Sequence, residues 1–217
     1  MPELWIKICG IRSAADIEAA VAAGADALGF VFYEPSPRHL AIGSARTLQE
    51  AVPAHVERVA VFLHPSQAEV DAVIDALRPD WVQTDLEDLD GLRLPRGPRV
   101  LPVLRKIGSE PIFRVPKNGS EPLFGGSRAM LDGGTSGTGV RADWAAARAL
   151  ASRCELVLAG GLDADNVAEA IRTVRPFGVD VSSGVEHARG MKDPARVRDF
   201  INAARSAARA LTEEGGR

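Results

Sequence analysis

The sequence has little cysteine: two residues, Cys9 and Cys154, in a chain of 217. Small secreted domains that depend on disulfides carry more cysteine than this, so a disulfide framework is excluded. The chain also lacks any run near the ~18 consecutive apolar residues that a membrane-spanning helix needs. The N-terminus lacks the basic and apolar regions of a signal peptide, so cytoplasmic residence is the default expectation.

An excess of charge of either sign is also missing. The formal net charge is -3 and 25% of the residues are charged, which is ordinary for a folded domain. This balance argues against a nucleic-acid surface, and we expect no nucleic acid and no membrane as partner. Local donors, rather than a positive field over the whole protein, must therefore hold any anionic ligand. The four histidines show no metal-ligand spacing and are interpreted as structural or surface residues: His39, His55, His64 and His187.

Short apolar segments alternate with helix signals along the whole chain. Hydrophobic residues make up 46% of it, enough for the core of one large domain. We expect strands at residues 4–9, 27–32, 56–63, 81–83, 100–104, 128–131, 155–159 and 178–182. We expect helices at residues 13–23, 44–52, 66–77, 142–152, 165–174 and 194–211, with Ser13, Ser66 and Asp193 as N-caps.

The alternation of strands and helices predicts an α/β fold, a single-domain (βα)8 TIM barrel over residues 1–211 with a frayed tail at 212–217. The fourth and fifth helical units are short or irregular, because 86–92 allows only a short helix and 107–122 is interpreted as a loop. An open doubly wound sheet is the alternative. An Arg-Pro turn between a helix and the next strand recurs four units apart, which favours the barrel. We also expect the protein to be a monomer.

In a barrel the carboxyl ends of the strands converge on one mouth, where catalytic groups lie. Cys9 ends the first strand and Asp132 follows the sixth, so a thiol and a carboxyl group can serve there as general base and general acid. Two ordinary alternatives compete, because cysteine is often a buried small hydrophobe and aspartate often begins a turn. The glycines at 133–139 are typical of a mobile lid. Other residues expected at the mouth are Phe32, His64, Gln83, Asp85, Arg105, Gly160 and Ser182.

Two glycine-bearing loops follow the last two strands. Gly160 and Gly161 come after the seventh strand, and residues 182–184 come after the eighth. Loops at these places donate backbone N–H groups to phosphate, although glycine pairs also form ordinary tight turns. Arg38 lies in a proline-stiffened loop after the second strand, where it can clamp a carboxylate; a solvated surface arginine is the alternative.

Seven motifs, in order along nearly the whole chain, resemble those of phosphoribosylanthranilate isomerase. They are KICGI at 7–11, GAD at 24–26, GFVFY at 29–33, SPR at 36–38, GGL at 160–162, DVSSGVE at 180–186 and GMKD at 190–193. The resemblance implies a barrel of the ribulose-phosphate-binding type and an Amadori rearrangement in tryptophan biosynthesis. The phosphorylated substrate would be N-(5'-phosphoribosyl)anthranilate, and neither a metal nor an organic cofactor is implied.

The resemblance also implies a role for each matching residue. Asp132 looks like the general acid that protonates the furanose ring oxygen, and Cys9 looks like the general base that removes the C2' proton. Arg38 is expected to hold the anthranilate carboxylate, and Asp180 is expected to meet a sugar hydroxyl. The phosphate is expected among Gly160, Gly161, Ser182, Ser183 and Gly184.

The chain departs from the family pattern at two places. Asp85 stands where the family has a histidine, and Val140 and Arg141 stand where it has a lysine and a threonine. The nearest alternative is a sugar-phosphate isomerase of histidine biosynthesis, or one enzyme for both reactions, but those barrels end the first strand with aspartate. A non-catalytic barrel that binds a phosphorylated ligand is the other alternative, and the intact Cys9 and Asp132 argue against it.

Overall fold

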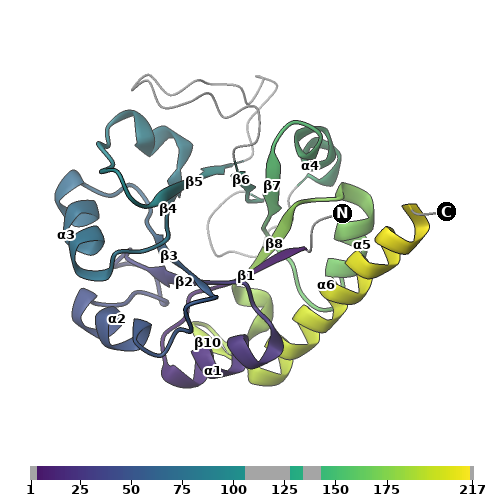
Figure 1. Ribbon diagram of the computed structural model, residues 1–217, viewed down its shortest axis with the longest axis horizontal. Coiled ribbons are helices and arrows are strands. Elements are labelled where there is room, and N and C mark those ends of the chain that lie inside the picture. Colours follow the sequence, from purple (N-terminus) through teal and green to yellow (C-terminus); the bar gives the residue numbers. More distant parts are fainter. Residues whose placement is uncertain (1–3, 106–127, 134–142, 216–217) are drawn as a thin grey trace.

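The computed structural model describes residues 4–105, 128–133 and 143–215. Within these residues, the strands β1 to β8 are parallel and close into one barrel in sequence order, with helices around it (Figure 1). β1 pairs with β2 on one side and with β8 on the other, which closes the sheet. The (βα)8 prediction is confirmed, and the open doubly wound sheet is wrong.

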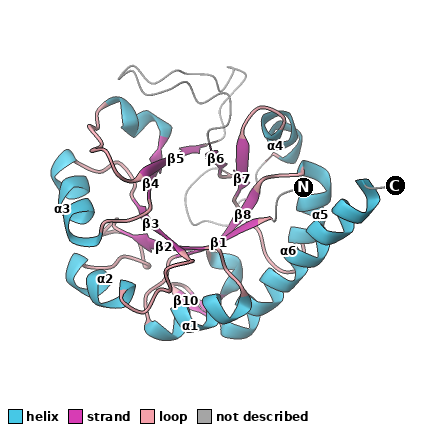
Figure 2. Ribbon diagram, viewed as in Figure 1, coloured by secondary structure: helices cyan, strands magenta, loops and turns pink. Residues whose placement is uncertain are grey.

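The described elements follow the predicted alternation of strands and helices (Figure 2). The barrel strands are β1 Trp5–Cys9, β2 Ala27–Val31, β3 Glu57–Val61, β4 Trp81–Asp85, β5 Arg99–Leu104, β6 Arg128–Leu131, β7 Glu155–Leu158 and β8 Gly178–Val181. The α-helices are α1 Ala14–Ala23, α2 Ile42–Gln49, α3 Gln67–Leu77, α4 Trp144–Ala151, α5 Val167–Val174 and α6 Pro194–Gly215. Two 3-10 helices, η1 Leu86–Asp90 and η2 Ser183–Val185, and an antiparallel pair, β9 Glu186–Ala188 with β10 Met191–Lys192, complete the described elements.

Capping side chains begin several of the helices, as the sequence predicts. The Ser13 hydroxyl accepts a hydrogen bond from the Asp16 backbone N–H, and the Asp16 carboxylate accepts one from the Ser13 backbone N–H. Ser66 forms the same reciprocal box at α3. The Asp193 carboxylate accepts hydrogen bonds from two backbone N–H groups of the first turn of α6. These side chains satisfy N–H groups that have no partner within the helix.

Some boundaries differ from the predicted ones. The fourth unit is the 3-10 helix η1, and α6 continues past the predicted end at residue 211 to Gly215, so part of the expected tail is helical. The loop expected at 107–122 and most of the glycine-rich segment lie outside the described residues. None of the helices that the structure describes is both long and apolar enough to cross a bilayer.

Each barrel strand divides its side chains between two cores. Ile6 and Ile8 pack in the layer between the sheet and the helices, whereas Trp5 packs with Trp81 inside the barrel. Successive side chains of a strand point to opposite faces, so Lys7 and Cys9 share the inward direction of Trp5. The inward face of β1 therefore carries an aromatic ring at its amino end and polar groups toward its carboxyl end.

An aromatic cluster with one central cation fills the amino end of the barrel. The Arg128 guanidinium lies 4.9 Å from the ring centre of Trp5, 4.7 Å from that of Trp81 and 4.2 Å from that of Phe177. Both indole N–H groups donate to Glu57, at 3.0 and 2.9 Å. These contacts stabilise the amino end of the barrel and fill its interior there. A binding cavity is therefore expected at the carboxyl end.

Candidate active site

A cavity of about 240 Å³ opens at the carboxyl end of the barrel. It brings together eight of the nine residues that the sequence predicts for the site: Cys9, Arg38, Asp132, Gly160, Gly161, Asp180, Ser182 and Ser183. Gly184 is the exception, because it does not line the cavity. A Cβ atom on Gly184 would lie 2.0 Å from the Leu162 carbonyl oxygen, so this glycine allows the loops after β7 and β8 to pack together.

Cys9 ends β1, and its side chain borders the cavity while the residue is 8% exposed. Burial raises the pKa of the thiol above its ordinary value, because a thiolate is poorly solvated there. Lys7 and Lys192 act in the opposite direction, and the negative charge of Asp180 adds to the rise. Cys9 is therefore a neutral thiol at neutral pH, beside two cations that favour its ionised form.

Asp132 follows β6 and faces the same cavity. Burial raises the pKa of this carboxyl above its ordinary value, and the charge of Asp180 acts in the same direction. Arg105 opposes the rise, because its Nη1 atom lies 3.1 Å from the Asp132 Oδ2 atom. The carboxyl thus retains its proton at higher pH than an exposed aspartate does.

Asp85, at the end of β4, holds Arg105 in place. Its two carboxylate oxygens accept hydrogen bonds from Nε and Nη2 of Arg105, each at 2.8 Å. This two-point contact fixes the plane of the guanidinium and directs Nη1 to Asp132. Asp85 is therefore linked to Asp132 through one arginine.

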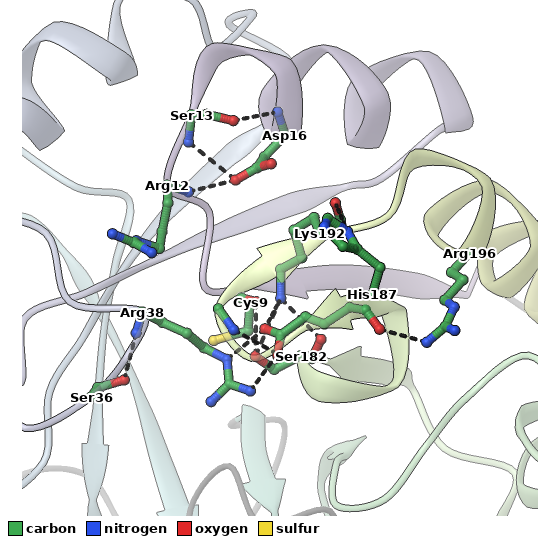
Figure 3. Close-up of polar contacts among 12 residues, drawn as sticks. Cys9, Arg12, Ser13, Asp16, Ser36, Arg38, Ser182, His187, Lys192 and Arg196 are labelled. Atoms are coloured by element: carbon green, nitrogen blue, oxygen red, sulfur yellow. Dashed lines mark hydrogen bonds and ion pairs between the residues drawn. The ribbon is translucent and has the colours of Figure 1, made fainter.

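Arg38 is buried and is held by an acidic partner from the other end of the chain. Its Nε and Nη2 atoms donate to the Glu186 carboxylate at 2.7 and 2.8 Å. Burial opposes the ionisation of Glu186, but hydrogen bonds from Arg38, Lys192 and the Gly190 backbone outweigh it and lower the pKa of Glu186 to about 2. Figure 3 shows Arg38 and Lys192 converging beside Cys9 and Ser182.

Gly10 makes room for this arginine. Its φ is +82°, in the left-handed region, and a Cβ atom there would lie 2.6 Å from Cδ of Arg38. Glycine is therefore required for the chain to turn after β1 and for the Arg38 side chain to cross this turn. The position of Arg38 at the cavity depends on the residue that directly follows Cys9.

The two predicted phosphate loops are tied to the rest of the site. Gly160 and Gly161 have φ of +87° and +63°, which turns the chain sharply after β7. The Ser182 hydroxyl donates to the Cys9 carbonyl oxygen at 3.0 Å, and the Lys192 ammonium donates to the Ser182 carbonyl oxygen at 2.9 Å. The loop after β8 is thus fixed against the end of β1, beside the thiol.

Comparison with known proteins identifies the family. A family model described as N-(5'phosphoribosyl)anthranilate (PRA) isomerase matches residues 6–203. The chain belongs to this family. The expectation from the sequence motifs is therefore confirmed.

Relatives of the PRA isomerase family align with nearly the whole chain. An N-(5'-phosphoribosyl)anthranilate isomerase of Pseudomonas paraeruginosa is 43% identical over 218 residues, which cover 96% of this chain and 99% of that protein. The protein of the same name from Thiobacillus denitrificans is 39% identical and covers 93% of this chain and 98% of its own length.

Solved structures of PRA isomerases share the fold. TrpF from Jonesia denitrificans superposes with a TM-score of 0.76 at 36% identity, covering 94% of this chain and 98% of that one. The enzyme from Thermotoga maritima gives a TM-score of 0.77 at 31% identity, covering 94% and 99%. Another PRA isomerase structure contains reduced 1-(o-carboxyphenylamino)-1-deoxyribulose 5-phosphate and is 30% identical to this chain, with a TM-score of 0.74 and coverage of 94% and 99%.

Within this family assignment, sequence reasoning placed some residues well and missed others. His64 is not at the cavity, because its side chain is exposed and bonds to Asp88 at 2.8 Å. Gln83 does line the cavity, and its buried Oε1 atom has no hydrogen-bond partner among the described residues, so it offers an acceptor to a ligand. Arg189 lines the cavity and was not predicted, and neither were three charged residues that lie beside the site: Lys7, Glu186 and Lys192. All three stand inside quoted motifs, and Lys7 occupies an inward position of a buried strand, which was the available signal.

Proposed function

We propose that this chain converts N-(5'-phosphoribosyl)anthranilate to 1-(2-carboxyphenylamino)-1-deoxyribulose 5-phosphate, a step of tryptophan biosynthesis, with Asp132 as general acid and Cys9 as general base. The family assignment supports the reaction. One observation carries the residue assignment: Cys9 and Asp132 reach the same cavity from β1 and from the end of β6. An acid and a base on different strands can act on two atoms of one small substrate.

The reaction begins with the proton on Asp132. The carboxyl gives this proton to the furanose ring oxygen while the bond from that oxygen to C1' breaks. The lone pair of the anthranilate nitrogen forms the C1'=N double bond, which leaves an iminium. Burial raises the pKa of Asp132, which suits a donor, and Arg105 stabilises the carboxylate that remains after the transfer.

The base step follows at C2'. The Cys9 thiolate takes the C2' proton, the C–H electron pair forms the C1'=C2' double bond, and the electrons of the C=N bond return to nitrogen. The 2'-hydroxyl of this enolamine then loses its proton while C1' gains one, which gives the ketone. Exchange of protons with solvent returns Cys9 and Asp132 to their starting forms, so no atom is gained or lost overall.

The remaining site residues hold the two ends of the substrate. Glu186 occupies the Nε–Nη2 side of Arg38, so the anthranilate carboxylate meets the Nη1 side. The phosphate lies at Gly160, Gly161, Ser182 and Ser183, with Gly184 fixing the loop shape. The Oδ1 atom of Asp180 accepts a hydrogen bond from Lys7, and its other carboxylate oxygen accepts a hydrogen bond from a sugar hydroxyl. Neither a metal nor an organic cofactor takes part in these steps.

We also propose that the protein acts as a monomer in the cytoplasm. The described helices include none that could span a membrane, which is consistent with this location. Light scattering of the purified protein checks the oligomeric state. A mass equal to two chains would contradict the monomer.

The fluorescence of phosphoribosylanthranilate, which changes as it is consumed, tests the reaction and the two roles. We expect wild-type turnover, and a loss of kcat on the order of a hundredfold to ten-thousandfold in Cys9→Ala and in Asp132→Asn. Cys154→Ala is the matched control, because this thiol lies at the other end of the barrel, and it should retain wild-type kcat. Unchanged turnover in either site variant would remove that residue's role. Absence of turnover in the wild type would contradict the proposed function and favour a binding barrel.

A further inference from the structure

Lys7 is a fully buried charged residue at the centre of the barrel, and no step above uses it. It stands on β1 two residues before Cys9, and its side chain is 0% exposed. An isolated ammonium in such a place loses its hydration and becomes neutral. A lysine that stays charged at this position needs partners that favour the charge.

Asp180 is the first partner. It lies opposite Lys7 in the register of β1 and β8, and its Oδ1 atom is 2.7 Å from the Lys7 Nζ atom. Burial acts to lower the pKa of Lys7, but Asp180 and Cys9 together outweigh this effect and the pKa is raised above its ordinary value. Lys7 is therefore an ammonium inside the barrel.

Cys9 is the second partner, because each group shifts the pKa of the other: Cys9 raises that of Lys7, and Lys7 lowers that of Cys9. Gly29, paired with Cys9 in the register of β1 and β2, marks the place where the two groups meet. A Cβ atom on Gly29 would lie 3.0 Å from the Cys9 Sγ atom and 3.1 Å from the Lys7 Nζ atom. The absence of a side chain at Gly29 thus allows the ammonium and the sulfur to approach each other.

The charged groups that face Cys9 come from several elements. β1 contributes Lys7, β8 contributes Asp180, and β10 contributes Lys192. Asp132 faces the same cavity from the end of β6, and Arg38 and Arg189 also line it. β2 contributes Gly29 and apolar neighbours, without charge. Lys7 exerts the largest charge effect on the thiol, ahead of Asp180 and Lys192. The ionised form of Cys9 depends on Lys7 more than on any other of these charges.

We propose that Lys7 is a positioning residue that stabilises the thiolate of Cys9, with Asp180 keeping Lys7 charged and Gly29 leaving space for the contact. This role deepens the proposed function and rests on it where turnover is concerned, because it explains how a buried thiol supplies a base. The thiolate itself can be measured without substrate, so the ion pair is testable apart from catalysis.

Alkylation of Cys9 by iodoacetamide measures the thiolate, because the thiolate is the form that reacts. The parent for all variants carries Cys154→Ala, which leaves Cys9 as the single cysteine. The rate is followed by intact mass over about pH 6 to about pH 10.5, without substrate, and the midpoint of its rise is read. We expect Lys7→Met to move this midpoint upward by at least about one pH unit, which is about tenfold slower alkylation at pH 8.

Gly29→Ala is the second variant, and it retains both Lys7 and Asp180. Its methyl group separates sulfur from ammonium, so the midpoint should also move upward, whereas a steric block alone would lower the plateau rate and leave the midpoint in place. Arg58→Met is the matched control, since it removes another strand cation paired with an aspartate, Asp80, at the amino end of the barrel. Its midpoint should equal that of the parent.

Circular dichroism and a thermal melt establish that each variant is folded. A folded Lys7→Met or Gly29→Ala protein with the parent midpoint would overturn the role of Lys7. Should Lys7→Met not fold, the midpoint of Gly29→Ala decides alone. If the alkylation midpoint moves in the Lys7→Met or Gly29→Ala protein while Cys9→Ala keeps its isomerase turnover, the ion pair is supported and the base role is contradicted. Failure of this inference and failure of the proposed function are therefore distinguishable.

Discussion

The Nη1 atom of Arg105 lies 3.1 Å from Oδ2 of Asp132, so a cation sits directly beside the proposed general acid. Asp85 holds the other side of the same guanidinium with two hydrogen bonds. Burial and the charge of Asp180 keep the proton on Asp132, while Arg105 favours its release. The acidity of Asp132 is therefore a balance of these effects, and Asp85 influences it by holding Arg105.

Removal of the Arg105 cation should shift the pH dependence of the reaction. In the active form, Asp132 carries a proton and Cys9 is a thiolate. The other singly protonated form, with an Asp132 carboxylate and a Cys9 thiol, has the same net charge. The profile of kcat/KM is then bell-shaped, with the carboxyl on the acid side and the thiol on the alkaline side. Arg105→Met takes away an interaction that lowers the Asp132 pKa, so the acid limb should move to higher pH.

Asp85→Asn gives a matched test of the same contact. This variant retains Arg105 but weakens its two hydrogen bonds to residue 85, so the acid limb should shift less than in Arg105→Met. The kcat should fall, because the guanidinium is less well placed. Steady-state rates from about pH 4 to about pH 10 measure both variants. An acid limb that stays at the wild-type pH in Arg105→Met would show that Arg105 does not influence the titrating acid.

Arg38 should determine substrate affinity through the anthranilate carboxylate. Arg38→Lys keeps a positive charge but loses the planar fork, so we expect KM to rise about tenfold to a hundredfold, the loss of one or two charged hydrogen bonds. Inhibition by inorganic phosphate is the internal control, because the proposed phosphate site lies at the loops after β7 and β8, so the inhibition constant should not change. A rise in both constants together would point to general damage of the cavity.

Glu186 should stabilise the fold in a defined range of pH. Its folded-state pKa of about 2 lies below the ordinary 4.5, so this contribution is present above pH 4.5 and is lost as the pH falls toward 2. The side chain is 4% exposed, and the shift corresponds to about 3 kcal/mol.

Glu186→Gln should therefore lower the free energy of unfolding at pH 7 by roughly 3 kcal/mol, because Arg38 and Lys192 lose their anionic partner. The variant should also lose stability less steeply than the wild type between pH 4.5 and 2. Urea unfolding at several pH values measures both effects. Parallel curves for the two proteins across this range would contradict the assigned cause.

Arg128 should contribute to stability rather than to catalysis. Arg128→Met removes a cation that lies against three aromatic rings, and we expect a loss of about 1–3 kcal/mol in the free energy of unfolding. Arg99→Met is the matched control, since Arg99 stacks on Trp81 alone and its side chain is 55% exposed. That variant should lose less than about 0.5 kcal/mol. Urea unfolding followed by tryptophan fluorescence compares the two, and equal losses would be the contrary result.

Much of the fold follows from local patterns in the chain. Short apolar strands between capped helices predicted the barrel, and the Ser13, Ser66 and Asp193 caps begin helices as expected. Strand ends were also predictable, because an apolar run that stops at a polar residue or a glycine marks the mouth. Cys9 and Asp132 were placed at the cavity by this reasoning. Helix ends were less accurate, as α6 shows, because no strong stop signal follows residue 211.

The sequence by itself determined the fold class, the family and the positions of the thiol, the carboxyl group and the two glycine-bearing loops at the cavity. Only the tertiary structure decided which charges surround them. Arg38 meets Glu186 across 148 residues of chain, and Lys7 meets Asp180 across 173. These contacts depend on strand register and on barrel closure, which no local spacing encodes. The protonation of Cys9 and Asp132 depends on such neighbours and on burial, and so it belongs to the folded barrel.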